Sequence, residues 1–511
     1  MNVLEKLRPP LPMIGSAALG SAVLSRLLAH PRAADLLLRR LADPALDGHD
    51  LAAVRPLRTF LLKMGAGALP REAWPAMAKM VGASGELYGK TARAHARGEP
   101  VVWVTWPVPA AVVAAFPGVL AHTPETFFAM ANAAEPDGST RMCEVADRHG
   151  VPGEICSINR CVLGAFLDGQ LPTPTMVVTG NTPCDGNHSG NTVLRELAGA
   201  DHFSVSGSYD RTAGSVALWA RSVWELIAYL EARLHRSLDW GLLRQHARNL
   251  NRVNRALNRV TELHRATPAP GVLNPLALYW HMVIAYGWEP AIAEGAELLA
   301  DAAQHLVERA RRTNAPRERL RVVLGDQAMA WTDFAGWLHH EYGGTIVCDY
   351  LGHFEHPPID LSTRESLIEG LVHDRLLTSM VRQAHGTMEL TLDELSTALK
   401  EYDADCVIFH GNVGCKHNLA LRREIDEVCR AARVPACFLD ADIIDRRVVD
   451  EGPLRRKIAA FLSAEGLPRG TNARAVPLRE RLSALAGRVR RGRSDDTRAG
   501  GDGPPDLSEA S

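Results

Sequence analysis

Short apolar runs that alternate with helical patterns constrain the fold of this chain more than any other feature. The first run is VVWVTW at residues 101–106, and others lie at 175–178, 202–206, 321–326, 345–352, 405–412 and 435–442. Between them, apolar residues recur at the three- and four-residue intervals typical of helices. Strands joined by helices run parallel. The sequence therefore predicts an α/β protein with two flavodoxin-like doubly wound parallel-sheet lobes, an N-terminal helical extension and inserted helices.

The same patterns predict how the chain is divided. Leu, Ala and Met recur at helical spacing near the N-terminus and again between the two groups of strands, whereas the C-terminal end lacks apolar periodicity. We expect an N-terminal helical region at 1–99, a first α/β lobe at 100–212, a helical segment at 213–316, a second flavodoxin-like lobe at 317–475, and a basic helix end with a disordered tail at 476–511.

Several helices can be placed from local signals. Residues 107–120 (PVPAAVVAAFPGVL) follow the first strand and predict a helix entered through prolines. Ser362 with Glu365, and Thr391 with Glu394, have the spacing of capping boxes at helix starts.

Residues 84–91 (SGELYGKT) come close to a phosphate-binding P-loop. Ser84 occupies the place of the first glycine, and the preceding residues have a helical pattern where a P-loop needs a strand. We expect a helix break followed by a basic helix, and a chain that does not itself hydrolyse ATP.

Charge and cysteine usage restrict the partners and the compartment. A net charge of -2 argues against binding to nucleic acid or an anionic membrane surface through bulk electrostatics. An apolar stretch near the N-terminus imitates a signal peptide, but Arg26 interrupts it, and a packing helix is expected there. The nine cysteines have no disulfide-like spacing, which indicates a reducing compartment and favours the cytoplasm.

Three cysteines stand where strands are predicted to lead into helices. Cys156 heads a helical run, Cys184 lies in the turn sequence TPCDG, and Cys415 follows the run at 405–412. Ligands of open α/β sheets gather at the carboxyl ends of the strands, and helix N-termini lower thiol pKa values, which favours metal binding. Ordinary buried cysteines are an equally good interpretation of the spacing, because the chain has no Cys-x-x-Cys.

Four motifs carry a resemblance to a known family. They are EICS at 154–157, PCDG at 183–186, GCK at 414–416 and PACFLDADIID at 435–445. In order and setting they resemble the 2-hydroxyacyl-CoA dehydratase and benzoyl-CoA reductase family, in particular the D-component of 2-hydroxyglutaryl-CoA dehydratase, over residues 101–467. The resemblance implies two flavodoxin-like lobes and a 4Fe-4S cluster held by Cys156, Cys184 and Cys415.

The resemblance also implies an activity and its partners. A 2-hydroxyacyl-CoA has a β-proton that the thioester does not acidify, so elimination of water requires one low-potential electron that forms a ketyl radical. The implied enzyme is a 2-hydroxyacyl-CoA dehydratase-like lyase, with an acyl-CoA substrate, a related sister subunit and a separate ATP-hydrolysing iron–sulfur activator. Two alternatives stay open: a subunit of an ATP-dependent aromatic acyl-CoA (benzoyl-CoA type) reductase or double-cubane reductase, and a non-catalytic electron-relay or structural partner.

Other residues near these motifs are weaker candidates. Cys161 forms an iron–sulfur-like Cys-x4-Cys spacing with Cys156, although five residues is a poor match to one helix face, and we expect a packed neighbour. Cys143 is left open, and Cys348, Cys406, Cys429 and Cys437 are expected to be structural. Possible proton-handling or supporting groups are Glu154, Ser157, Asp185, His188, His410 and His417.

Overall fold

The structure is a computed structural model that describes residues 11–30 and 69–468. Within these ranges it leaves out residues 136, 209, 211, 273–282, 284, 326–328, 330–331, 333, 350–354 and 385. The predicted C-terminal tail at 476–511 and much of the predicted N-terminal region therefore lie outside the described residues.

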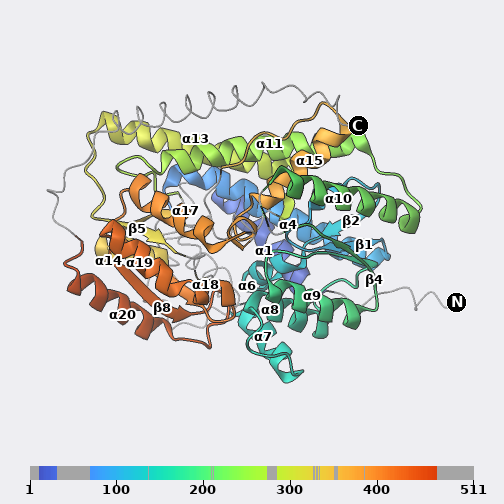
Figure 1. Cartoon of the computed structure of the whole chain (residues 1–511), viewed down its shortest axis with the longest axis horizontal. Coiled ribbons are helices and arrows are strands. Elements are labelled where there is room, and N and C mark those ends of the chain that lie inside the picture. Colours follow the sequence, from blue (N-terminus) through green and yellow to red (C-terminus); the bar gives the residue numbers. More distant parts are fainter. Residues whose placement is uncertain are drawn as a thin grey trace, which may run out of the picture. The chain divides into compact units, whose positions relative to one another are not determined.

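Two parallel sheets of four strands form the centre of the fold (Figure 1). The first has the order β2-β1-β3-β4 and the second the order β6-β5-β7-β8. The strands are β1 Val101–Val104, β2 Leu120–His122, β3 Met176–Gly180, β4 Asp201–Val205, β5 Leu320–Leu324, β6 Gly344–Asp349, β7 Cys406–Asn412 and β8 Ala436–Ala441. In each sheet the strand that comes first in the chain, β1 or β5, lies between the second and the third. The strand order therefore changes direction beside it, as in flavodoxin-like sheets. The predicted fold class, two doubly wound α/β lobes, is confirmed.

Helices precede, cover and connect the sheets (Figure 1). The N-terminal helices are α1 Pro12–Leu28 and α4 Trp74–Arg97, preceded by the short η3 Arg71–Ala73. The first lobe adds α5 Ala110–Ala114, η4 Pro124–Thr126, α6 Phe127–Ala134, α7 Gly138–Arg148, α8 Ser157–Leu167 and α9 Asp185–Ala198. Long helices α10 Ala213–Leu234, α11 Trp240–Leu263 and α13 Pro290–Arg312 follow. The second lobe adds α14 Phe334–Tyr342, α15 Arg364–Leu376, α16 Val381–Ala384, α17 Met388–Glu401, α18 Lys416–Ala420, α19 Arg422–Ala432 and α20 Glu451–Ala464.

The strands are apolar throughout because both faces of each sheet are covered. In β1, Val102 and Val104 belong to the core that includes the N-terminal and long helices, whereas Val101 and Trp103 belong to the core under α6, α7 and α8. Successive side chains of a strand point to opposite faces, so a strand buried on both sides has no polar alternation. This is why continuous apolar runs identified these strands in the sequence.

Four local predictions are wrong. Residues 107–120 contain only the short helix α5, and the chain then enters β2, which pairs with β1. The near P-loop lies inside the unbroken helix α4, where Gly85 lets the chain approach α1: a Cβ there would lie 2.9 Å from Ser21 Cβ. The capping box of α15 forms one residue later than expected, between Thr363 and Ser366.

The predicted capping box at Thr391 and Glu394 is also wrong, because both residues lie inside α17, which begins at Met388.

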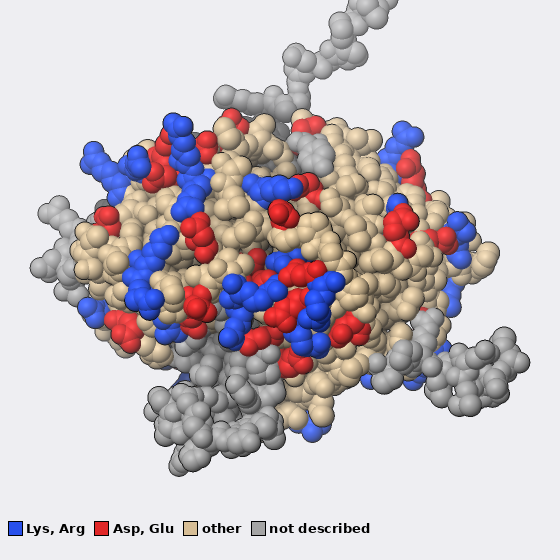
Figure 2. Space-filling model, turned by 90° about the horizontal axis from the view of Figure 1, so that it is seen from below, with Lys and Arg blue, Asp and Glu red and all other residues tan. Residues whose placement is uncertain are grey.

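On the face shown in Figure 2, described basic and acidic side chains are interspersed rather than gathered by sign. No helix in the described parts of the chain is both long and apolar enough to cross a bilayer.

Candidate functional site

One pocket brings together the three cysteines singled out in the sequence. Cys156 is the N-cap residue of α8, Cys184 that of α9 and Cys415 that of α18, and all three line the pocket. Cys184 follows β3 and Cys415 follows β7, which occupy equivalent positions in the two sheets. Both lie beside the point where the strand order reverses, the usual ligand position in such sheets.

The position of Cys156 differs from the prediction. No strand leads into α8, because the chain reaches it from α7 through the loop at 149–156. The prediction of a strand-to-helix junction at Cys156 is therefore wrong. The first lobe supplies two of the three cysteines, and the second lobe supplies the third.

Amide groups approach two of the cysteine sulfurs. The backbone N–H of Asn187 donates to Cys184 Sγ at 3.4 Å, the geometry of an N-cap. From the end of β7, Asn412 Nδ2 lies 3.9 Å from Cys156 Sγ, and the Asn412 carbonyl accepts the backbone N–H of Cys415 at 2.8 Å. These donors would stabilise negative charge on the sulfurs.

The expected lowering of the thiol pKa is wrong for Cys156 and Cys184. Burial, with smaller contributions from Cys184 and Asp442, raises the pKa of the Cys156 thiol to about 12. Burial also raises the pKa of Cys184, although the N–H groups at the start of α9 oppose it. Desolvation disfavours the thiolate more than the helix N-termini favour it. A cation bound in the pocket would be needed to hold these groups as thiolates.

The three cysteines supply the type of donor that an iron–sulfur cluster requires. Among the described residues, no group of three His, Cys, Asp or Glu side chains is arranged to hold one ion. In a 4Fe-4S cluster each cysteine binds a different iron, so the sulfurs need to surround a pocket rather than converge on one point. Cys156, Cys184 and Cys415 are free and line one pocket, so a cluster bound by them would have one iron without a protein thiolate.

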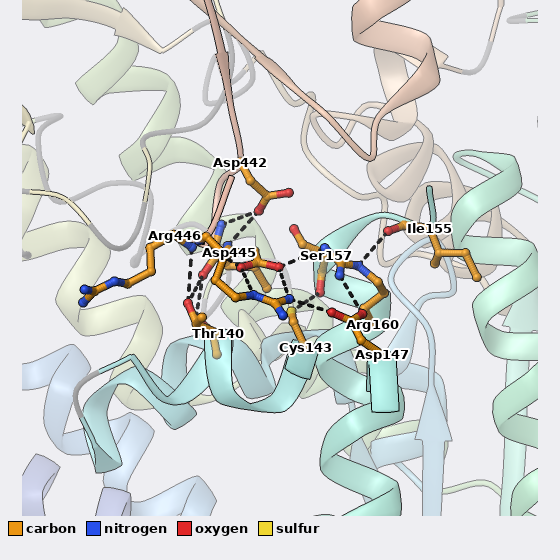
Figure 3. Close-up of polar contacts among 12 residues, drawn as sticks. Thr140, Cys143, Asp147, Ile155, Ser157, Arg160, Asp442, Asp445 and Arg446 are labelled. Atoms are coloured by element: carbon orange, nitrogen blue, oxygen red, sulfur yellow. Dashed lines mark hydrogen bonds and ion pairs between the residues drawn. The ribbon is translucent and has the colours of Figure 1, made fainter. Parts of the chain in front are cut away.

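A buried ion-pair network holds the Cys156 turn against the second lobe (Figure 3). Arg160 in α8 donates to the Ile155 carbonyl at 3.2 Å, to Asp147 at 2.9 Å and to Asp445 at 3.0 Å. Asp445 lies in the loop after β8, where Asp442 accepts two backbone N–H groups. The network therefore connects the loop before Cys156 with the loop after β8.

The two lobes also meet at a glycine. A Cβ added to Gly414 would lie 2.7 Å from Cys156 Cα and 3.1 Å from Cys156 N. A side chain there would have to displace the backbone of a predicted cluster ligand. Only glycine fits this approach between Cys156 and Cys415 without strain.

Gly414→Ala is expected to cost about 1–3 kcal/mol of stability, the usual range for overpacking, and to lower the iron content of the anaerobically purified protein. Gly186→Ala is a matched control, because Gly186 lines the same pocket but its Cβ would only reach ordinary contact, 3.7 Å from Cys156 Cβ. Urea unfolding and iron analysis of both variants measure the difference. Equal behaviour of the two variants would contradict the proposed constraint at Gly414.

An ion pair spans the pocket between the lobes. Lys416 Nζ lies 2.7 Å from Asp185 Oδ2, and the two residues directly follow Cys415 and Cys184. Both side chains line the pocket and remain largely exposed. The contact with Lys416 lowers the pKa of the Asp185 carboxyl, which makes Asp185 a weak base.

The other sequence candidates are dispersed. Ser157 and His410 are fully buried, Glu154 and His188 are exposed, and of these four none lines the pocket. His417 does line it, and burial lowers the pKa of its imidazole. The remaining cysteines are buried away from it: Cys143, Cys161, Cys348, Cys406, Cys429 and Cys437.

Sequence reasoning missed a buried carboxyl group close to Cys184. Glu125 follows β2, and its Oε1 accepts the Asn187 side-chain amide at 3.1 Å and the Trp106 backbone N–H at 3.3 Å. Burial raises the pKa of Glu125 despite these hydrogen bonds. The only signal in the sequence was the Thr-Pro-Glu turn at 123–125, which becomes informative once β2 is known to precede it.

Comparison with protein families agrees with this geometry. The family model described as 2-hydroxyglutaryl-CoA dehydratase, D-component, matches residues 105–464, which include both sheets' carboxyl ends and all three pocket cysteines. The chain belongs to this family. The resemblance seen in the four sequence motifs is thereby confirmed, and the chain is a 2-hydroxyacyl-CoA dehydratase component by family. Comparison with curated proteins found no match.

Proposed function

We propose that this chain is the iron–sulfur subunit of a 2-hydroxyacyl-CoA dehydratase, a lyase that removes water from an acyl-CoA. The observation that supports this most directly is the pocket lined by Cys156, Cys184 and Cys415, each at the start of a helix, in a chain of this family. In this proposal the three thiolates hold a 4Fe-4S cluster.

When bound, the cluster would supply the one low-potential electron that makes a thioester carbonyl a ketyl radical, and an open iron site for an oxygen of the substrate. The chain's own residues would support the cysteines that bind the cluster. Asn187 and Asn412 donate hydrogen bonds toward the sulfurs. The Arg160 network and Gly414 keep the Cys156 turn in place beside Cys415.

Proton handling is assigned to Glu125 before the exposed candidates. Burial raises the pKa of the Glu125 carboxyl, which favours its protonated form, and Glu125 Oε2 is buried. A buried carboxyl group with a raised pKa is a candidate for general acid–base chemistry. Glu125, Glu154 and His188 all lie outside the pocket lining. Glu125 ranks first because it is buried and hydrogen-bonded to Asn187, whose backbone N–H donates to Cys184, whereas Glu154 and His188 are exposed.

The proposed enzyme has two protein partners, an activator and a sister subunit. The segment that resembles a P-loop is helical, so ATP hydrolysis is assigned to a separate iron–sulfur activator that delivers the electron. A related sister subunit would complete a heterodimer around the pocket. Nine free cysteines suit a reducing compartment, and we propose a cytoplasmic location.

Anaerobic purification, iron and acid-labile sulfide analysis, and electron paramagnetic resonance test the proposal. We expect about four irons and four sulfides per chain and a spectrum that changes when a 2-hydroxyacyl-CoA is added. Absence of iron after anaerobic reconstitution would rule the proposal out. A cluster whose spectrum no acyl-CoA changes, with or without the sister subunit, would favour an electron-relay role instead.

A further inference from the structure

Two residues that line the cysteine pocket carry buried polar atoms that no described residue satisfies. These atoms are Oδ1 of Asn412 and Nε2 of His417. A buried donor or acceptor without a partner costs free energy, and the few that native proteins keep are usually satisfied by water or by a bound group. The pocket therefore has hydrogen-bonding capacity left over for something that binds in it.

Of these two atoms, only the histidine nitrogen can serve a cluster. The sulfides and thiolates of an iron–sulfur cluster accept hydrogen bonds and carry no proton to donate. Asn412 Oδ1 is also an acceptor, whereas a histidine ring nitrogen donates when it carries the proton. A histidine ring has at least one N–H in either protonation state, and its hydrogen-bond partner decides which nitrogen holds it. Beside a sulfur acceptor, Nε2 of His417 would be the donor.

Other polar side chains of the pocket wall already have partners. Gln383 Nε2 donates to Glu394 at 3.2 Å, and the Thr391 hydroxyl donates to the Gln383 carbonyl at 3.2 Å. The lysine of the wall is in an ion pair. His417 lies two residues after Cys415 in α18, and its Nε2 is buried although the residue as a whole is partly exposed. Its place beside a proposed ligand and its unused nitrogen single it out.

We propose that His417 donates a hydrogen bond from Nε2 to a sulfur of the cluster and so makes the cluster easier to reduce. The inference rests on the proposed function, because it needs the cluster held by the three cysteines. Reduction adds negative charge to the cluster, and a hydrogen-bond donor stabilises the more negative state. His417 thereby sets how readily the cluster takes the electron that the activator delivers.

Three substitutions at this position test the hydrogen bond. His417→Leu removes the donor, His417→Gln can place an amide N–H near the position of Nε2, and His417→Asn can place one only near that of Nδ1. The measurement is the midpoint potential of the cluster, from a redox titration of the anaerobically reconstituted protein followed by electron paramagnetic resonance. In the leucine and asparagine variants we expect the reduction equilibrium to shift about tenfold toward the oxidised cluster, which is about 59 mV for one electron. The glutamine variant should stay near the wild type.

His188→Leu is the matched control. His188 follows Cys184 by four residues in α9, but it is exposed and does not line the pocket. Removing its ring should leave the midpoint potential unchanged. Pulsed electron paramagnetic resonance of protein labelled with ¹⁵N-histidine gives a second readout. We expect a nitrogen coupling to the reduced cluster in the wild type and in His188→Leu, and its loss in His417→Leu.

The outcomes separate this inference from the function on which it rests. An unchanged or more positive potential in both His417→Leu and His417→Asn would overturn the hydrogen bond alone, as would loss of iron or an equal shift in His417→Gln. A wild type that holds no iron after anaerobic reconstitution would overturn the proposed function and the inference with it. If His417→Leu retains no iron, the comparison of the glutamine and asparagine variants decides. A wild-type potential preserved by glutamine and not by asparagine supports the inference.

Discussion

Replacing Cys156, Cys184 or Cys415 by alanine is expected to abolish cluster binding, and all activity that depends on the cluster, in each single variant. Each of the three supplies one thiol to the same pocket, and no other cysteine lines it among the described residues. A cubane held by only three protein thiolates has no spare ligand. Iron content after anaerobic reconstitution, with the paramagnetic spectrum, is the measurement, and iron should fall to background.

Cys161→Ala is the matched control for these variants. Cys161 lies five residues after Cys156 in the same helix, but its side chain is fully buried in the core under α6, α7 and α8. Its sequence spacing made it a possible ligand, and its position now predicts full retention of iron. Loss of the cluster in Cys161→Ala, or its retention in any of the three ligand variants, would refute the proposed ligand set.

Removing the guanidinium of Arg160 should cause the second large effect, on stability. Its side chain is 7% exposed, and its partner Asp445 is 2% exposed. Arg160→Met keeps much of the apolar stem but leaves Asp445 with fewer cationic partners and Ile155 without its donor. Breaking one side of a buried ion pair costs about 3–5 kcal/mol, and because Arg447 still contacts Asp445 we expect about 3 kcal/mol.

Urea unfolding measures this loss, and Arg423→Met is its control. Arg423 pairs with Glu427 on the surface of α19, where the two side chains are 86% and 61% exposed. Exposed pairs of this kind contribute about 0–1 kcal/mol. A loss in Arg160→Met no greater than in Arg423→Met would show that the network does not fasten the Cys156 turn to the loop after β8.

The sequence by itself identified seven of the eight strands and singled out the three cysteines that line the pocket. Strands such as β1 and β7 are buried on both faces, so their composition is apolar without interruption and can be recognised locally. Cys184 and Cys415 stand out because the residues around them form turns rather than core. β2 was missed because it has only three residues, follows α5 and a Pro-Gly turn at 117–118, and is recognised mainly by its pairing with β1.

Only the tertiary structure decided how those cysteines are supported and what surrounds them. Lys416 meets Asp185 across 231 positions of sequence, Arg160 meets Asp445 across 285, and Glu125 meets Asn187 across 62. Periodicity and capping motifs report the conformation of neighbouring residues, within a few positions of each other. Contacts between distant segments depend instead on how helices pack around the two sheets, and no local pattern encodes them. The ion pair across the pocket is therefore a property of the fold.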